Sequence, residues 1–210
     1  MLAGSPLAAP GAVREDADMT QPSRAALLVI DAQESFRQRT EEWAATANPR
    51  VLHNIAMLVD RARTDGDLVV WVTHSEPGTG GVFDPEQGFV RVVSEFEPRP
   101  DELQVTKTTV NAFTSTDLQS RLAEHGVERL VICGIRTEQC CETTARVASD
   151  LGFAVEFVTD ATTTSPIAAG DGYGAVSGED IMRRTESILA ARGFARVVTT
   201  AERTGVAAVV

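Results

Sequence analysis

The amino-acid sequence predicts an α/β fold, a three-layer α-β-α sandwich around a six-stranded parallel sheet. Six short apolar runs recur along the chain, at residues 25–30, 68–73, 103–106, 130–133, 154–159 and 195–199. Continuous runs of this length are typical of strands that are buried on both faces. Segments with a helical spacing of apolar residues separate most of them. Strands that alternate with helices form a parallel sheet with right-handed crossovers and helices on both faces.

The first strand, 25–30, ends at Asp31. The pair Asn48-Pro49 then opens a helix, because asparagine is a good N-cap and proline suits the first helical position. The predicted buried face of this helix consists of apolar residues at helical spacing: Leu52, Ile55, Leu58 or Val59, and Ala62. Gly66 ends the helix, and the second strand, 68–73, follows it.

The segment 74–100 is rich in glycine and proline and has no clear period. We therefore predict a long loop, of the kind that often covers a functional site. The third strand, 103–106, ends at Lys107. Leucines at helical spacing predict a helix over 116–125.

The fourth strand, 130–133, leads into a helix that runs to about Leu151. Thr137 as N-cap would place Cys140 at the third helical position, inside the first turn. The face of this helix that we predict to be buried carries small and apolar side chains: Cys141, Thr144, Ala145, Ala148 and Leu151.

The remaining elements complete the alternation. The fifth strand, 154–159, ends at Asp160. A glycine-rich loop over 165–178 follows it, then a helix over 179–192 and the last strand, 195–199.

The length of 210 residues suits one well-buried core. Residues 1–24 are rich in alanine, proline, glycine and aspartate and show no periodicity. They also lack the basic start and continuous apolar core of a secretory signal. We predict a disordered N-terminal segment over 1–24 and one domain over 25–210.

The composition indicates what the protein binds and where it works. The formal net charge is -11 and the pI is near 4.7, which argues against nucleic acid or an anionic membrane as a partner. No apolar run approaches the roughly 20 residues of a membrane span. Three clustered cysteines without a Cys-x-x-Cys pair form no disulfide framework. We expect a small-molecule substrate and a reducing, cytoplasmic location.

Cys140 is the most informative of the three cysteines. In the first turn of a helix, its thiol would feel the positive end of the helix dipole. That position favours the thiolate, which is the nucleophilic form of cysteine near neutral pH. The alternative is that Cys140 is a small buried packing residue, as most free cysteines are.

Three reactive residues follow different predicted strands: Asp31, Lys107 and Cys140. Open parallel sheets bind ligands beyond the carboxyl ends of their strands. Taken singly, Asp31 could be a helix cap and Lys107 a solvated edge charge. Their convergence with Cys140 at one edge of the sheet instead predicts a catalytic site.

Several motifs in this chain resemble those of the isochorismatase-like cysteine hydrolase superfamily, which includes nicotinamidases, N-carbamoylsarcosine amidohydrolases and isochorismatases. The motifs are Leu-Val-Ile-Asp31-Ala-Gln33, Lys107 with Asn111-Ala-Phe113 and Thr116-Asp-Leu118, and Gly134-x-x-Thr137-x-x-Cys140 with Thr144-Ala145 and Gly152. The resemblance covers about residues 25 to 200. It implies the strand order 3-2-1-4-5-6 and a homo-oligomer, a dimer or a tetramer.

The resemblance also implies the roles of the site residues. Asp31, Lys107 and Cys140 would be catalytic, and a cis peptide bond would join Ile135 to Arg136. The backbone N–H groups of Arg136 and Cys140 would form an oxyanion hole. The thiolate would then cleave a C–N bond of a small amide or carbamoyl compound through a thioester, and this chemistry needs no cofactor.

The sequence departs from its relatives at several positions. Metal-dependent nicotinamidases carry Asp-x-His after the second strand, whereas this chain has Thr73-His74 there, so we expect no metal. Ser35 stands where a second aspartate is common. Arg136 is large where small residues are frequent; it could bind a substrate carboxylate or pair with a surface acid.

The predicted pocket and two alternative functions complete the sequence-based interpretation. The pocket is predicted to include five side chains: Gln33, Phe36, His74, Phe113 and Arg136. One alternative is an isochorismatase-type ether hydrolase, which needs no nucleophile. The other is a non-catalytic binding or redox-sensing protein, in which Cys141 would resolve an oxidised Cys140.

Overall fold

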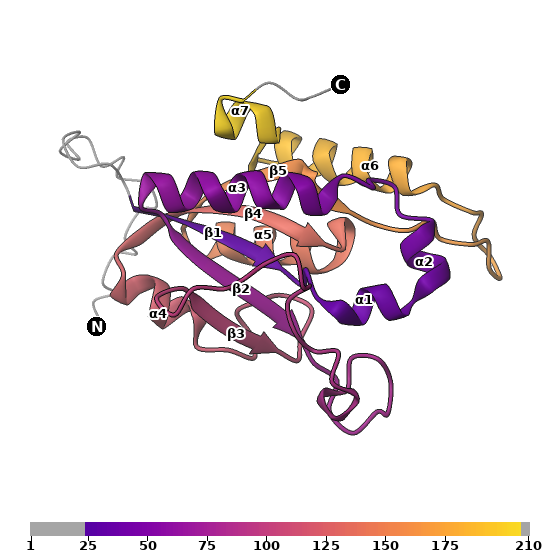
Figure 1. Cartoon of the computed structure of the whole chain (residues 1–210). Coiled ribbons are helices and arrows are strands. Elements are labelled where there is room, and N and C mark those ends of the chain that lie inside the picture. Colours follow the sequence, from indigo (N-terminus) through magenta and orange to yellow (C-terminus); the bar gives the residue numbers. More distant parts are fainter. Residues whose placement is uncertain (1–23, 207–210) are drawn as a thin grey trace, which may run out of the picture.

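The computed structural model describes residues 24–206. Its strands are β1 (Arg24–Ile30), β2 (Leu68–His74), β3 (Leu103–Lys107), β4 (Val127–Ile135), β5 (Ala154–Thr163) and β6 (Arg196–Val198). They form one sheet in the order β3-β2-β1-β4-β5-β6, and every neighbouring pair is parallel. The predicted fold class and strand order are therefore confirmed (Figure 1).

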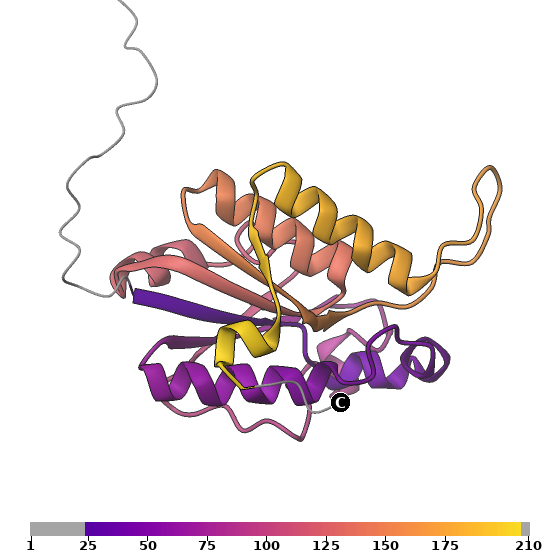
Figure 2. The same ribbon diagram turned by 90° about the horizontal axis from the view of Figure 1, so that it is seen from above.

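Helices cover both faces of the sheet (Figure 2). The α-helices are α1 (Glu34–Gln38), α2 (Thr40–Ala44), α3 (Val51–Asp65), α4 (Leu118–Glu124), α5 (Glu142–Asp150), α6 (Gly178–Ala191) and α7 (Thr200–Thr204), with a π-helical turn at Thr137–Cys141 and a 3₁₀ turn at Pro85–Gln87. Helices α4, α5 and α6 lie on one face, and α3 and α7 lie on the other. No helix of the described residues is long and apolar enough to cross a membrane.

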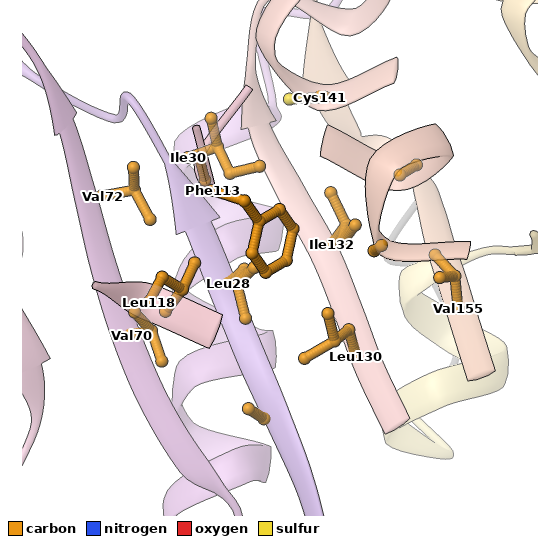
Figure 3. Packing of buried hydrophobic residues seen from close by; sticks show 14 of the residues in the cluster. Leu28, Ile30, Val70, Val72, Phe113, Leu118, Leu130, Ile132, Cys141 and Val155 are labelled. Atoms are coloured by element: carbon orange, nitrogen blue, oxygen red, sulfur yellow. The ribbon is translucent and has the colours of Figure 1, made fainter. Parts of the chain in front are cut away.

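Alternate residues of each central strand point into two separate cores. On β1, Leu28 and Ile30 join the core beneath α4, α5 and α6, while Leu27 and Val29 join the core beneath α3. Side chains that alternate between the faces of a sheet need apolar partners on both sides when helices cover both. This is why β1 is a continuous apolar run. Figure 3 shows the first of these cores, with Leu28 and Ile30 among its side chains.

Strands β1 and β5 are among those that extend beyond their apolar runs. Strand β5 continues through Thr162 and Thr163, which pair with Gly134 and Ile135 after a register shift in the β4–β5 ladder. These threonines are polar, so the sequence gave no strand signal for them. Their pairing with β4 keeps them in the sheet. Arg24, the last residue of the segment predicted to be disordered, begins β1; the rest of that segment lies outside the described residues.

The start of α3 differs from the prediction. The helix begins at Val51, and its N-cap residue is Arg50 rather than Asn48. The Asn48 side chain has two uses: its Oδ1 accepts from the Arg50 N–H at 3.1 Å, and its amide donates to the backbone carbonyls of Asp160 and Thr162 on β5. A local turn and a long-range contact thus share this side chain.

The sequence did not predict the short helices α1, α2 and α7. Each has five residues, too few to show a helical period or to be stable alone. Leu151 corrects another prediction: it is 38% exposed, because α5 ends at Asp150. The other four residues of the predicted face are buried: Cys141, Thr144, Ala145 and Ala148. Cys141 lies just before α5 begins.

A substitution at Gly134 tests whether the close approach of β1 and β4 beside the predicted site is needed for stability. Its φ is 129°, and a Cβ there would lie 1.9 Å from the Ile30 carbonyl oxygen. We expect Gly134→Ala to lower the free energy of unfolding by about 3 kcal/mol or more, from overpacking and backbone strain. Gly152→Ala is the matched control, because it also has a positive φ but nothing within 4 Å. Urea denaturation that gave equal losses for both variants would contradict the prediction.

Candidate active site

The structure brings the three predicted reactive side chains together. Lys107 Nζ lies 2.8 Å from Asp31 Oδ2 and 3.3 Å from Cys140 Sγ. The side chains of Asp31 and Lys107 are completely buried, and Cys140 is 9% exposed. Asp31 follows β1, Lys107 ends β3, and Cys140 lies in the turn after β4, so the cluster lies at the carboxyl edge of the sheet.

Asp31 has an unusual backbone conformation. Its φ of 51° is the only positive value among the described non-glycine residues, and such values often occur at functional sites. The Asp31 N–H donates to the Val72 carbonyl at 2.8 Å, and the Gln33 N–H donates to the Asp31 carbonyl at 2.8 Å. These bonds hold the tight turn that directs the carboxylate to Lys107.

The Lys107 ammonium has three close partners. Besides Asp31 and Cys140, its Nζ lies 3.4 Å from His74 Nδ1. An ammonium group can only donate, so Nδ1 accepts and the proton of a neutral His74 ring is on Nε2. That nitrogen faces Glu76 Oε1 at 3.3 Å. The sequence placed His74 only in the pocket; its contact with Lys107 depends on the β2–β3 register, which pairs the two residues.

Burial controls the protonation of the cluster. It raises the pKa of Asp31 above its usual value, against the opposing effects of the Lys107 charge and the Cys140 thiol. Burial alone would lower the pKa of Lys107, but Asp31 and Cys140 keep that pKa raised. For Cys140, burial and the Asp31 charge raise the thiol pKa to about 12, although Lys107 lowers it. The expected thiolate is therefore wrong for the resting protein: the Cys140 thiol is protonated.

The turn that carries Cys140 also differs from the predicted helix start. Thr137–Cys141 is a π-helical turn, and its N-cap residue is Arg136. Thr137 is not the cap: its Oγ1 donates to Thr162 Oγ1 at 2.9 Å. This long-range bond to β5 replaces the predicted local capping bond. Cys140 occupies the fourth position of the turn instead of the third.

Gln33 and Ser35 hold the loops around the cluster. The Gln33 side-chain carbonyl accepts from the His74 N–H at 2.6 Å, and its amide donates to the His74 carbonyl and to Ser35 Oγ. Ser35 Oγ in turn donates to the Phe89 carbonyl in the long loop after β2. Gln33 is fully buried, so in this structure it positions His74 rather than facing an open pocket.

An aromatic wall lies beside the cluster. Phe36 and Phe83 meet edge to face at 5.0 Å between ring centroids, and both pack with Ile135. The His74 ring lies 5.6 Å from Phe83. Sequence reasoning missed Phe83, which lies within the long loop and carries no periodic signal.

Arg136 immediately precedes the turn that carries Cys140. The peptide bond between Ile135 and Arg136 is cis, as the resemblance implied. The Arg136 guanidinium pairs with Glu42, and the side chain lines a small cavity with eight neighbours: Phe36, Glu42, Trp43, Thr46, Ile135, Thr163, Thr164 and Ser165. The described residues offer no hydrogen-bond partner to the Arg136 backbone N–H.

Phe113 does not line this cavity. Its ring packs in the core beneath α4 and α5, stacked on Phe153 at 6.1 Å. Figure 3 shows Phe113 beside Leu28 and Ile132. Phe113 thus packs in the same core as Cys140, and its predicted pocket role stays a prediction.

A parallel sheet in this order, with a cluster of reactive groups at its carboxyl edge, defines an open doubly wound α/β protein. Comparison with known proteins identifies the group within that class. The chain belongs to the isochorismatase family, whose isochorismatase domain model matches residues 25–202.

Similar proteins are named hydrolases. Streptothricin hydrolase of Streptomyces noursei is 38% identical over 144 residues, which are 69% of this chain and 51% of that protein. Nicotinamidase 3 of Arabidopsis thaliana is 34% identical over 154 residues, 67% of this chain and 73% of that protein. Among solved structures, the cysteine hydrolase of Pseudomonas syringae pv. phaseolicola superposes with a TM-score of 0.78 at 27% identity, covering 89% of this chain and 99% of that one.

Removing the cation should expose the cost of the buried Asp31 charge. We expect Lys107→Met to lower the free energy of unfolding by about 3–5 kcal/mol at pH 8. The loss should be smaller at pH 5. Without Lys107, the pKa of folded Asp31 rises further above its unfolded value near 4, so the folded state binds the extra proton and its stability falls as the pH rises.

The control is the double variant Asp31→Asn/Lys107→Met, which carries neither charge of this buried pair. It should be more stable than Lys107→Met at pH 8 and should lose the pH dependence. Urea unfolding at both pH values measures this. Equal stability of the single and double variants would show that the pair is not coupled.

Proposed function

We propose that this protein is a cysteine-dependent hydrolase that cleaves a C–N bond of a small amide or carbamoyl compound through a thioester acyl-enzyme. One observation carries the proposal: a single buried ammonium, Lys107, contacts both a carboxylate at 2.8 Å and a thiol sulfur at 3.3 Å. Nucleophile, base and electrostatic stabiliser are thus within reach of one another.

The first half-reaction transfers the acyl group to sulfur. As Cys140 Sγ attacks the substrate carbonyl carbon, Asp31 accepts the thiol proton and Lys107 stabilises the negative charge on sulfur. An S–C bond forms, and the carbonyl π electrons move to oxygen. The backbone N–H groups of Arg136 and Cys140 stabilise this oxyanion; each such donor contributes roughly 10²–10³ in rate.

Collapse of the tetrahedral intermediate completes the acyl transfer, and hydrolysis of the thioester then restores the enzyme. The C–N bond breaks as Asp31 gives its proton to the leaving nitrogen, so ammonia or an amine departs and a thioester remains. Asp31 then takes a proton from a water molecule that attacks the thioester. The C–S bond breaks, the acid product leaves, and the proton returns to Cys140 Sγ.

The raised pKa values suit this sequence of proton transfers. Burial raises the pKa of Asp31, so the carboxyl group can hold the transferred proton long enough to deliver it. Because burial also raises the thiol pKa to about 12, Cys140 needs Asp31 as a base in the same step. The resting thiol is thereby protected from unproductive reactions in water.

Two observations weigh against the alternative functions. An ether hydrolase that works through Asp31 alone has no use for a thiol held on Lys107. A redox sensor needs a resolving thiolate, but Cys141 is buried in the apolar core (Figure 3). Burial also raises the pKa of Cys141 well above its usual value. The hydrolase names of two relatives favour a hydrolytic function over a non-catalytic one.

We further propose a homo-oligomer, a dimer or a tetramer, that acts on a small molecule in the cytoplasm. All three cysteines are free thiols, which suits a reducing compartment. The hairpin before α6, which projects from the body in Figure 2, exposes Ile167, Tyr173 and Val176. Exposed apolar side chains on one projection are suited to association with another copy.

Turnover on a panel of amides tests the proposed chemistry. The panel consists of nicotinamide, pyrazinamide, ureido and N-carbamoyl compounds, with ammonia release as the readout. We expect at least one substrate whose hydrolysis disappears in Cys140→Ala, and an acyl-enzyme visible by intact-mass spectrometry. Cys133→Ala is the control, because Cys133 is a buried thiol on β4 away from the cluster. Full turnover by Cys140→Ala would refute the covalent mechanism.

The thiol pKa tests the part played by Asp31. Since the Asp31 charge raises the pKa of Cys140 and Lys107 lowers it, Asp31→Asn should lower that pKa and Lys107→Met should raise it. Thiolate absorbance at about 240 nm, with Cys140→Ala as the blank, measures both. Asp31→Asn should nevertheless lose about 10²–10⁴ in kcat/KM, because it lacks the base. A more acidic thiol with undiminished turnover would remove Asp31 from the mechanism.

A further inference from the structure

The Arg136 side chain packs on the aromatic wall formed by Phe36 and Phe83. Its guanidinium lies over the Phe36 ring, 5.7 Å from the centroid, and the side chain is 15% exposed. The same residue is bonded into the turn that carries the thiol, because the Cys141 N–H donates to the Arg136 carbonyl at 3.1 Å. Arg136 is therefore placed to meet a substrate bound at Cys140.

A second guanidinium stands beside the first. Arg39 lies over the Phe83 ring at 4.8 Å, and Phe83 contacts Phe36 edge to face. Burial lowers the pKa of Arg136, and the charge of the neighbouring Arg39 lowers it as well. Two guanidiniums on adjoining aromatic rings form a seat for an anion, because each cation needs a partner where aromatic rings displace water.

The chain itself fills this seat with Glu42. One Glu42 oxygen pairs with Arg136 Nη2 and lies 3.7 Å from Arg39 Nη1. Glu42 belongs to α2, none of whose residues is buried, and its side chain is 46% exposed. A carboxylate with this exposure can turn into water at small cost, since exposed ion pairs contribute about 1 kcal/mol or less.

The other acid near the seat is Glu138, whose charge also acts on Arg136. With Glu42 turned away, the seat holds two cations against this one acid. The net charge then favours an incoming anion. A carboxylate suits a guanidinium best, because its two oxygens match the planar fork of donors.

We propose that Arg136 and Arg39 bind a carboxylate of the substrate, which replaces Glu42 in the seat. This inference rests on the proposed function and narrows its substrate to small amide or carbamoyl compounds that also carry a carboxylate. Arg136 then supplies two contacts, its backbone N–H to the scissile carbonyl and its guanidinium to the carboxylate. The scissile carbonyl and the carboxylate of the substrate are thus only a few bonds apart.

A matched pair of alkylating agents tests the seat without a known substrate. Iodoacetate carries a carboxylate and iodoacetamide does not, and both alkylate the same thiol. The readout is the iodoacetate-to-iodoacetamide rate ratio at Cys140, divided by the ratio for glutathione in the same buffer and measured by intact mass, with Cys140→Ala as the blank. We expect Arg136→Gln to lower this ratio roughly tenfold, the size of a lost charged hydrogen bond.

Glu42→Gln should change the ratio in the opposite direction. It leaves both guanidiniums in place and removes their internal anion, so the ratio should rise several-fold. Arg37→Gln is the control: Arg37 pairs with Glu95 and lies over Trp43, outside the seat. It changes the net charge as Arg136→Gln does, and the ratio should stay close to that of the unmodified protein.

The outcomes separate this inference from the proposed function. Alkylation of Cys140 with the same ratio in Arg136→Gln, Glu42→Gln and the unmodified protein would refute the seat and leave the thiol chemistry intact. An equal fall in Arg37→Gln and Arg136→Gln would also refute it, because the effect would then be one of net charge. Failure of both reagents to reach Cys140 would overturn the proposed function, and the seat with it.

Discussion

The buried ion pair between Asp31 and Lys107 is the constraint on which the rest of the site depends. Both side chains are shielded completely from solvent, and removing two charges from water costs several kcal/mol each unless they stay together. Their strands β1 and β3 are not neighbours, because β2 lies between them. The pair therefore requires all three strands to end at matched positions.

Backbone bonds across the strand ends meet that requirement. The Asp31 N–H donates to the Val72 carbonyl, and the Ser75 N–H donates to the Lys107 carbonyl. His74, at the end of the intervening strand, pairs with Lys107 in the β2–β3 ladder and gives its ring nitrogen to the ammonium. The fourth strand end of the site comes from β4, where Gly134 allows the chain to pass close to Ile30 before the turn to Cys140.

The depth of the cluster shapes both its chemistry and its access. Burial keeps the Cys140 thiol protonated, so reactivity depends on a base within reach rather than on a stable thiolate. Phe36, Arg136 and Glu42 of α2 line a small cavity. Glu42 on this short, exposed helix occupies the cationic seat. Proton transfer at the cluster and the pairing of Glu42 with Arg136 and Arg39 are thus two separate features of the site.

The sequence alone determined the strands, the fold class and the three residues of the cluster. Apolar runs of strand length are buried on both faces wherever helices cover a sheet, and polar residues that end parallel strands share one edge. These are local signals, and they hold whatever the rest of the chain does. The family resemblance added the strand order and the cis peptide bond at Arg136, which no local pattern carries.

Only the tertiary structure decided which groups are partners. Thr137, which is suited to capping, binds β5 instead, and the Asn48 amide also binds β5. Phe113 packs in the core that also contains Cys140. The protonation of Cys140 and the pairing of Arg136 with Glu42 likewise depend on burial and on segments distant in sequence. Hydrogen-bond partners and local dielectric are set by what folding places nearby, and this information is absent from any short stretch of sequence.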